Sequence, residues 1–173
     1  SKIEQYFELN KKTIDVKWCN SLIQFQKKIK IEIESFFSKP RFHEGYVINQ
    51  IIKGLPKKTN LLIGNSSPIR DLDSYTFNMD KKIKVFSNRG ASGIDGLIST
   101  AIGMSIDQSC NNALIIGDVS FYYDLTALNI IKNIPVCLTI FIINNSGGHS
   151  FDRLDNLSTQ RKSNYDKFWL SHR

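Results

Sequence analysis

The sequence predicts an α/β fold, a doubly wound parallel sheet with helices on both faces. Short apolar runs recur at residues 61–64, 83–87, 113–117 and 137–143. Segments of helical length separate these runs, and each run is apolar on both faces, which is typical of strands covered on both sides. With 173 residues, of which 41% are hydrophobic and 23% charged, the chain can form one domain of ordinary composition plus an appendage.

The first helix is expected over residues 18–37. Its apolar side chains recur at steps of three and four, at Trp18, Leu22, Phe25, Ile29, Ile33 and Phe36. Pro40 ends this helix because a proline disfavours a helical conformation in the residue before it. A second helix is expected over residues 43–54, ahead of Pro56. The helices between the strands are expected over residues 66–74, 94–107 and 120–132.

Ligands of such sheets bind beyond the carboxyl ends of the strands, so a site is expected in the segments that follow them. These four segments are NSSPIR (65–70), NRGASG (88–93), DVS (118–120) and NNSGGHS (144–150). All four are rich in small, polar or charged residues. The sequence therefore predicts a polar ligand site at one edge of the sheet.

Asp118 and Asn145 are candidate cation ligands because each follows a strand and offers a hard oxygen. Mg²⁺ is commonly held by one or two carboxylates together with phosphate oxygens. Gly147 and Gly148 would let the backbone approach a ligand closely. An aspartate, an asparagine, a backbone carbonyl and two phosphate oxygens would together satisfy the ion. The alternative for each residue taken alone is an ordinary turn.

Two helix starts are candidate phosphate sites. GASG (90–93) is expected to lead into a helix from Ile94, with free N–H groups facing an anion and Asp95 in the first turn. GDVS (117–120) is expected to open the next helix, where Ser120 can cap it or bond a phosphate. Two such helix starts would suit a diphosphate.

Arg70 and Arg89 are candidates to bind a carboxylate, and Ser66 could add a hydroxyl. The alternative for each arginine is a surface residue without a ligand. His149 is either an acid–base group or an ordinary loop histidine.

The composition bears on partners and compartment. Residues 1–58 hold 12 Lys and Arg against 6 Asp and Glu, which indicates either an anionic partner or a solvated helix face. Cys19, Cys110 and Cys137 lack disulfide or zinc spacing, so we expect unpaired, buried thiols in a reducing compartment. No apolar run is long enough to cross a bilayer. Abundant Ile, Lys and Asn indicate an A/T-rich genome, so a soluble protein of the plastid stroma or bacterial cytoplasm is expected.

GDVS (117–120) and NN (144–145) resemble the thiamine-diphosphate motif, which begins with GD and ends with NN about 30 residues later. SNRGASGIDG (87–96), GNSSPIR (64–70) and NNSGGHSF (144–151) are similar to one family in particular. That family is the 2-succinyl-5-enolpyruvyl-6-hydroxy-3-cyclohexene-1-carboxylate synthases of menaquinone and phylloquinone biosynthesis. The resemblance covers residues 42–151 clearly, and it implies a thiamine-diphosphate-binding fold.

The resemblance also implies residue roles and a reaction. Mg²⁺, or Mn²⁺, would be held by Asp118, Asn145 and Gly147. The cofactor would contact Ser92, Gly93, Ile94, Gly117, Asp118, Val119, Ser120, Asn145, Gly147 and Gly148, with Ile94 as the apolar wedge that keeps it bent. Substrate would contact Ser66, Arg70, Arg89 and Phe151. The transferase would decarboxylate 2-oxoglutarate and add the succinyl carbanion equivalent to isochorismate.

The same resemblance implies that the chain holds half of an active site. The family's activating glutamate lies in an N-terminal domain, so no catalytic residue is expected here and the chain alone is expected to be inactive. Residues 1–40 would be a linker or the end of a middle domain, and residues 41–173 a cofactor-binding domain that is incomplete at its C-terminus. The chain would be a fragment, or the product of a split or decayed gene. The complete enzyme would be a homodimer or tetramer.

Departures from the family and two alternatives remain open. Val119 stands where the general thiamine-diphosphate motif often has glycine, although this family tolerates an aliphatic residue there. His149 and Ser150 stand where a polar or small residue and then an aliphatic one are usual in the family. The alternatives are another thiamine-diphosphate enzyme related to acetolactate synthase, and a non-catalytic remnant or basic interaction module. Neither nucleic acid nor a membrane is an expected partner.

Overall fold

A computed structural model describes residues 16–39, 42–77, 82–107 and 109–149. The chain divides into two compact units, Ser1–Arg41 and Phe42–Arg173. In the first unit the described part is helix α2, Val16–Ser38, which confirms the helix expected over residues 18–37. No residue of α2 is buried, and its Trp18 and Phe25 side chains are each 62% exposed.

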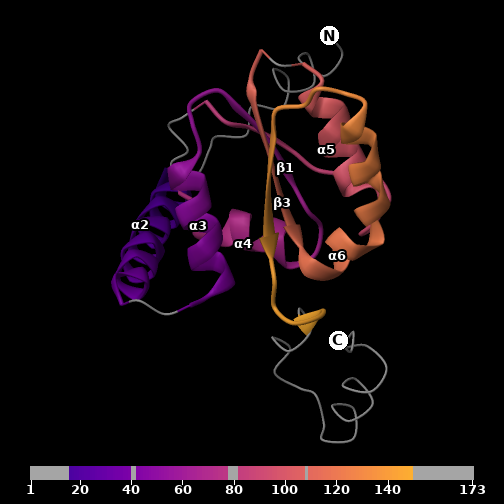
Figure 1. Cartoon of the computed structure of the whole chain (residues 1–173). Coiled ribbons are helices and arrows are strands. Elements are labelled where there is room, and N and C mark those ends of the chain that lie inside the picture. Colours follow the sequence, from indigo (N-terminus) through magenta and orange to yellow (C-terminus); the bar gives the residue numbers. More distant parts are fainter. Residues whose placement is uncertain (1–15, 40–41, 78–81, 108, 150–173) are drawn as a thin grey trace, which may run out of the picture. The chain divides into compact units, whose positions relative to one another are not determined.

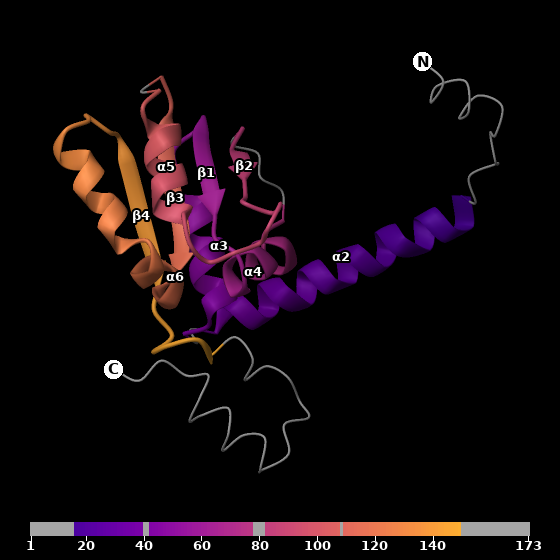
Figure 2. The same cartoon turned by 90° about the vertical axis from the view of Figure 1, so that its right-hand side faces the viewer.

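The second unit is built around a four-stranded parallel sheet with the order β2-β1-β3-β4. The strands are β1, Thr59–Ile63; β2, Lys84–Phe86; β3, Asn111–Gly117; and β4, Leu138–Ile143. Figure 2 shows them in this order across the sheet. The register pairs Leu61 with Val85 on one side and with Ala113 on the other, and it pairs Gly117 with Ile143. The predicted parallel α/β class is confirmed.

Helices cover both faces of this sheet (Figure 1). On one face lie α3, Glu44–Gly54, and α4, Ser67–Tyr75; on the other lie α5, Leu97–Ser105, α6, Asp118–Tyr123, and the 3₁₀ helix η1, Leu125–Lys132. Because successive residues of a strand point to opposite faces, Leu61 and Ile63 face the first layer and Leu62 faces the second.

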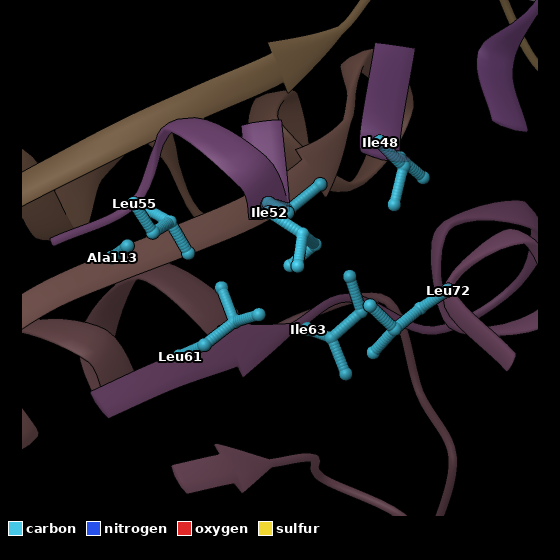
Figure 3. Packing of buried hydrophobic residues seen from close by; sticks show 8 residues of the cluster. Ile48, Ile52, Leu55, Leu61, Ile63, Leu72 and Ala113 are labelled. Atoms are coloured by element: carbon cyan, nitrogen blue, oxygen red, sulfur yellow. The ribbon is translucent and has the colours of Figure 1, made fainter. Parts of the chain in front are cut away.

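Each face carries its own apolar core. Figure 3 shows the first, in which helix side chains meet those of the two central strands; its buried members are Ile48, Ile52, Leu55, Leu61, Ile63, Leu72, Ala113 and Ile115. The second is formed by Leu62, Leu97, Ile98, Ala101, Ile102, Leu114, Ile116 and Ala127. Burying a Leu or Ile side chain stabilises a fold by roughly 1.5–3 kcal/mol, so these layers fix the two central strands firmly.

The two outer strands are less buried than their apolar sequences predict. All three residues of β2 are exposed, and Ile142 of β4 is 43% exposed. The reason is position in the sheet, because β1 and β3 have neighbours on both sides within the described residues whereas β2 and β4 are at its edges. Apolar composition alone does not distinguish an outer strand from a central one.

Two predicted helices have different bounds in the structure. The helix expected over residues 94–107 begins at Leu97, because Gly96 has a left-handed backbone with φ of 69°. The helix expected over residues 120–132 is two elements, α6 and η1, which are separated at Asp124. The cysteines are free as expected, but none of the three is buried as predicted: Cys19 and Cys110 are half-buried, and Cys137 is exposed.

Candidate functional site

The segments that follow the parallel strands lie at one end of the sheet, beyond the carboxyl ends of the strands. The register that pairs Gly117 with Ile143 places the turn after β3 beside the turn after β4. Asp118 is the half-buried first residue of α6, and residues 144–148 form the facing loop. The structure thus brings together the two turns that carry the predicted cation ligands.

Asp118 connects these turns through its carboxylate. Its Oδ1 accepts a hydrogen bond from the Val119 N–H at 2.9 Å, and its Oδ2 accepts one from the Gly147 N–H at 2.8 Å. Gly147 is buried and has φ of 109°, which a residue with a side chain rarely adopts. A glycine at this position therefore lets the second loop turn its N–H toward Asp118.

Asn145 is held from two sides. Its Oδ1 accepts a hydrogen bond from the Gly148 N–H at 3.2 Å, and its Nδ2 donates one to Oε1 of Glu44 at 3.1 Å. Glu44 begins α3, 101 residues earlier in the chain. Sequence reasoning missed Glu44, since no local pattern shows that the start of α3 contacts the loop after β4.

The donor atoms at this edge fit Mg²⁺. A carboxylate, a carboxamide and backbone carbonyls are hard oxygen donors, and Mg²⁺ takes few protein ligands when phosphate oxygens complete its shell. In the described part of the chain no group of three or more His, Cys, Asp or Glu residues could hold a metal ion. Apart from Gly117 and its two chain neighbours, no atom of the described residues lies within 4 Å of the position that a Cβ on Gly117 would take, so there is open space at this point of the turn. The assignment of Asp118, Asn145 and Gly147 as ligands stays a prediction.

The start of α5 differs from its expected role. GASG (90–93) does not lead directly into the helix, and Asp95 precedes the first turn, since Gly96 is the N-cap. Asp124 accepts hydrogen bonds from the Ser99 N–H at 2.7 Å and from the Ser99 hydroxyl at 3.0 Å. One of the first N–H groups of α5 therefore faces a carboxylate of the protein. The expected helix start at Ile94 is wrong, while a diphosphate contact at the start of α5 stays a prediction.

The start of α6 follows the prediction more closely. Gly117 is the N-cap and Asp118 the first helical residue, so Ser120 lies inside the helix and is buried. It does not cap α6, which corrects one of the two roles expected for it. Val119 is half-buried, and its N–H is the donor to Asp118.

The loop of residues 87–96 is tied to the turn after β1 by Asn65. This buried side chain is 3% exposed, and its Nδ2 donates hydrogen bonds to the carbonyls of Asn88 at 3.0 Å and Gly93 at 2.5 Å. Its Oδ1 accepts a bond from Arg89 Nη1 at 3.4 Å. Ser92, Gly93 and Ile94 therefore lie in a loop fixed at Gly93. Sequence reasoning missed Asn65, although it follows a strand just as Asp118 does.

The predicted substrate residues lie on two segments. Ser66 is the N-cap of α4, with φ of 70° and no side-chain capping bond, and Arg70 is exposed on that helix. Arg89 is exposed on the neighbouring loop and contacts Asn65. His149 is half-buried, while Ser150 and Phe151 lie outside the described residues. A shared carboxylate site for the two arginines stays a prediction.

These features define a class of protein. The second unit is an all-parallel α/β domain with helices on both faces, and its fold is consistent with that of thiamine-diphosphate-binding domains. In folds of this class, ligands bind beyond the carboxyl ends of the strands, where the polar loops lie. None of the helices in the described ranges combines the length and apolarity that crossing a membrane requires.

Comparison with known proteins narrows the class. No family model matches the chain. Over 143 residues, or 82% of this chain, it is 42% identical to the 2-succinyl-5-enolpyruvyl-6-hydroxy-3-cyclohexene-1-carboxylate synthase of Listeria innocua. It is 41% identical over 66% of its length to the Bacillus velezensis synthase of that name, and 38% identical over 80% to that of Staphylococcus epidermidis.

The matched regions make up 24%, 20% and 24% of those three relatives, so the chain spans about a quarter or less of their length. The resemblance drawn from the sequence motifs is confirmed. This chain is a homologue of one part of the 2-succinyl-5-enolpyruvyl-6-hydroxy-3-cyclohexene-1-carboxylate synthases.

Proposed function

We propose that this chain supplies the diphosphate- and metal-binding half of the active site of a 2-succinyl-5-enolpyruvyl-6-hydroxy-3-cyclohexene-1-carboxylate synthase that uses thiamine diphosphate and Mg²⁺. The enzyme would be a transferase of menaquinone or phylloquinone biosynthesis. The names of the relatives of this chain support its assignment to the synthase family. The observation that carries the site is the hydrogen bond from Gly147 N–H to Asp118, which unites the two turns.

Each turn has a part in binding the cofactor. Asp118 and Asn145 would hold Mg²⁺ through side-chain oxygens, and Gly147 through its carbonyl. Gly117 and Gly148 would let the backbone approach the diphosphate, and Ile94 would contact the cofactor from the loop that Asn65 fixes. When bound, thiamine diphosphate would supply the carbanion chemistry by which 2-oxoglutarate loses CO₂ and its succinyl remainder adds to isochorismate.

The arginines would act on the substrates. Both proposed substrates carry carboxylates, and a guanidinium binds a carboxylate through two parallel hydrogen bonds. The Arg89 guanidinium donates one hydrogen bond from Nη1 to Asn65, and the residue is exposed, so its remaining N–H donors can turn to a ligand. The glutamate that activates the cofactor would come from another domain of the same or a partner subunit.

Calorimetry tests the cofactor site. The chain is mixed with a Listeria innocua synthase from which the matching quarter has been removed, and thiamine diphosphate is titrated with and without Mg²⁺. We expect binding that requires Mg²⁺. Asp118→Ala should weaken this binding by more than about 100-fold, because loss of a metal ligand should cost more than the 10- to 100-fold typical of a residue that only hydrogen-bonds to a ligand. Asp73→Ala is the matched control, because Asp73 is exposed on α4.

Two results would contradict the proposal. One is the absence of Mg²⁺-dependent binding in the mixture, and the other is unchanged metal affinity in a folded Asp118→Ala chain, with circular dichroism as the check on folding. Product analysis then separates the reactions, because an acetolactate-synthase relative would turn over pyruvate instead of 2-oxoglutarate with isochorismate.

A further inference from the structure

Glu44 is placed with precision by the start of α3. It is the first residue of that helix, and the preceding His43 is the N-cap, whose Nδ1 accepts a hydrogen bond from the Gly45 N–H at 3.1 Å. Such a bond satisfies one of the first N–H groups of a helix, which have no partner inside it, and so stabilises the helix start. The backbone of Glu44 is therefore set by the helix, and its carboxylate reaches the loop after β4.

The side-chain amide of Asn145 has two partners of opposite kind. The Oε1 atom of Glu44 accepts a hydrogen bond from Asn145, whereas the Gly148 N–H donates one to it. If the amide turned over, its oxygen would face a carboxylate and its NH₂ group would face an N–H. Both contacts would then be repulsive, so each partner selects the same orientation.

This orientation determines which atom of Asn145 faces the candidate cation site. Its NH₂ group is directed to Glu44, and its Oδ1 is directed to the loop that contains Gly147 and Gly148. The Gly147 N–H in turn contacts Asp118. A cation needs the oxygen of a carboxamide, because an NH₂ group presents hydrogen atoms and no free electron pair to it.

We propose that Glu44 is a positioning residue that keeps the carboxamide oxygen of Asn145 turned toward the metal. The inference rests on the proposed function. It assigns to the start of α3 a part in metal affinity that no strand-end motif contains. Groups that hydrogen-bond to metal ligands typically contribute 10- to 100-fold to metal affinity.

The carboxylate could instead act by its negative charge alone, and a pair of variants separates the two effects. Glu44→Gln keeps a side-chain oxygen that accepts from Asn145 but removes the charge, whereas Glu44→Leu removes both. Positioning predicts that Glu44→Leu weakens metal binding about 10-fold or more and that Glu44→Gln stays within about 3-fold of wild type. A pure charge effect predicts equal losses in both variants.

The experiment uses the full chain labelled with ¹⁵N-glycine, in the mixture described above, with thiamine diphosphate and Mn²⁺. Paramagnetic broadening of the Gly147 amide signal against Mn²⁺ concentration gives the affinity at the site. Without metal, proton exchange of the Asn145 side-chain amide, followed in a ¹⁵N-asparagine sample, should be faster in Glu44→Leu only. Glu32→Leu, at an exposed position of α2, controls for loss of a carboxylate.

Exchanging the acid and the amide between positions 44 and 145 tests the contact between Glu44 and Asn145. Asn145→Asp sets two carboxylates against each other, and adding Glu44→Gln restores a donor and an acceptor. We expect the double variant to bind Mn²⁺ more tightly than Asn145→Asp alone, which is non-additive behaviour typical of residues in contact.

The outcomes distinguish this inference from the proposed function. Equal Mn²⁺ affinity in wild type and Glu44→Leu, or equal losses in the Gln and Leu variants, overturns the role of Glu44 and leaves the synthase proposal intact. Absence of broadening at Gly147 in the wild-type mixture overturns both. Tighter binding on adding Glu44→Gln to Asn145→Asp, together with a selective loss in Glu44→Leu, supports the inference.

Discussion

Asn65 uses both its amide donors and its oxygen while it is almost completely buried. A buried amide without partners would cost about 1–3 kcal/mol, so these bonds are required as well as favourable. Two of them end on backbone carbonyls of the loop that carries Arg89 and Ile94. One side chain therefore connects the proposed substrate and cofactor segments.

Removing this side chain should loosen that loop. In Asn65→Ala we expect the free energy of unfolding to fall by about 1–3 kcal/mol, because the carbonyls of Asn88 and Gly93 lose their donor. Deuterium exchange of peptides covering residues 88–96 should accelerate by about tenfold or more. Asn60→Ala is the control, since Asn60 contacts Asn112 at the other end of β1. Unchanged exchange in residues 88–96 would contradict the role given to Asn65.

Residues differ in how far the sequence alone reveals their role. Asp118 and the glycines after β4 could be predicted to meet because parallel strands place their carboxyl ends at one edge. Glu44 could not, since its partner lies 101 residues away and the contact depends on how α3 folds back to the loop after β4. Asn65 and its partners do follow neighbouring parallel strands, but the residue type alone does not show which side chain of the turn bonds to the facing loop. Hydrogen-bond partners of this kind are set by tertiary packing, which no local pattern contains.

At the scale of elements, the second helical layer is joined at Asp124. This residue separates α6 from η1, and its carboxylate contacts Ser99 in the first turn of α5. A carboxylate is favourable there because the first N–H groups of a helix have no partners inside it. The backbone of Asp124 departs from helical values, with φ of −122° and ψ of 18°, and the apolar stretch of residues 120–132 is interrupted at this residue.

Loss of that contact should destabilise the layer. Asp124→Ala removes two hydrogen bonds to Ser99, so we expect the free energy of unfolding to fall by about 0.5–2 kcal/mol, the usual cost of losing a helix cap. Ser99→Ala removes only the hydroxyl bond and should cost less. Urea unfolding measures both losses of stability, provided that the slope of the free energy against urea concentration is the same in the variants and the wild type. A larger loss in Ser99→Ala than in Asp124→Ala would contradict this account of the α5 start.

Element identity could be predicted from the sequence better than element boundaries. The apolar runs and their spacing predicted the four strands of the described sheet and its two helical layers, because the length of an apolar run and the spacing of its apolar residues indicate a buried strand or a packed helix. The start of α5 could not be placed, since the left-handed conformation at Gly96 depends on the loop that enters it. Burial of β2 and β4 was overestimated because apolar runs do not distinguish edge strands from central ones.

Over the described part of the second unit, packing is strongest at the sheet centre and weakens toward both edge strands. Leu61, Ile63, Leu114 and Ile115 are entirely or almost entirely buried, whereas Val85 and Phe86 are 38% and 44% exposed. The pairing of β3 with β4 extends over six residue pairs, and that of β1 with β2 over three. Asp118 and Asn65 thus follow the two most firmly held strands.

This gradient should appear in native-state hydrogen exchange. We expect amides of β1 and β3 to exchange slowest, those of β4 to be intermediate and those of β2 fastest, because local opening follows the number of buried contacts. Amides of β2 protected as strongly as those of β1 would contradict this order. Asn145 follows β4, the less protected of the two strands that carry the proposed cation ligands. Its bond to Glu44 connects it to α3, whose Ile48 and Ile52 pack on β1 and β3, so the firm centre of the sheet also supports the weaker side of the site.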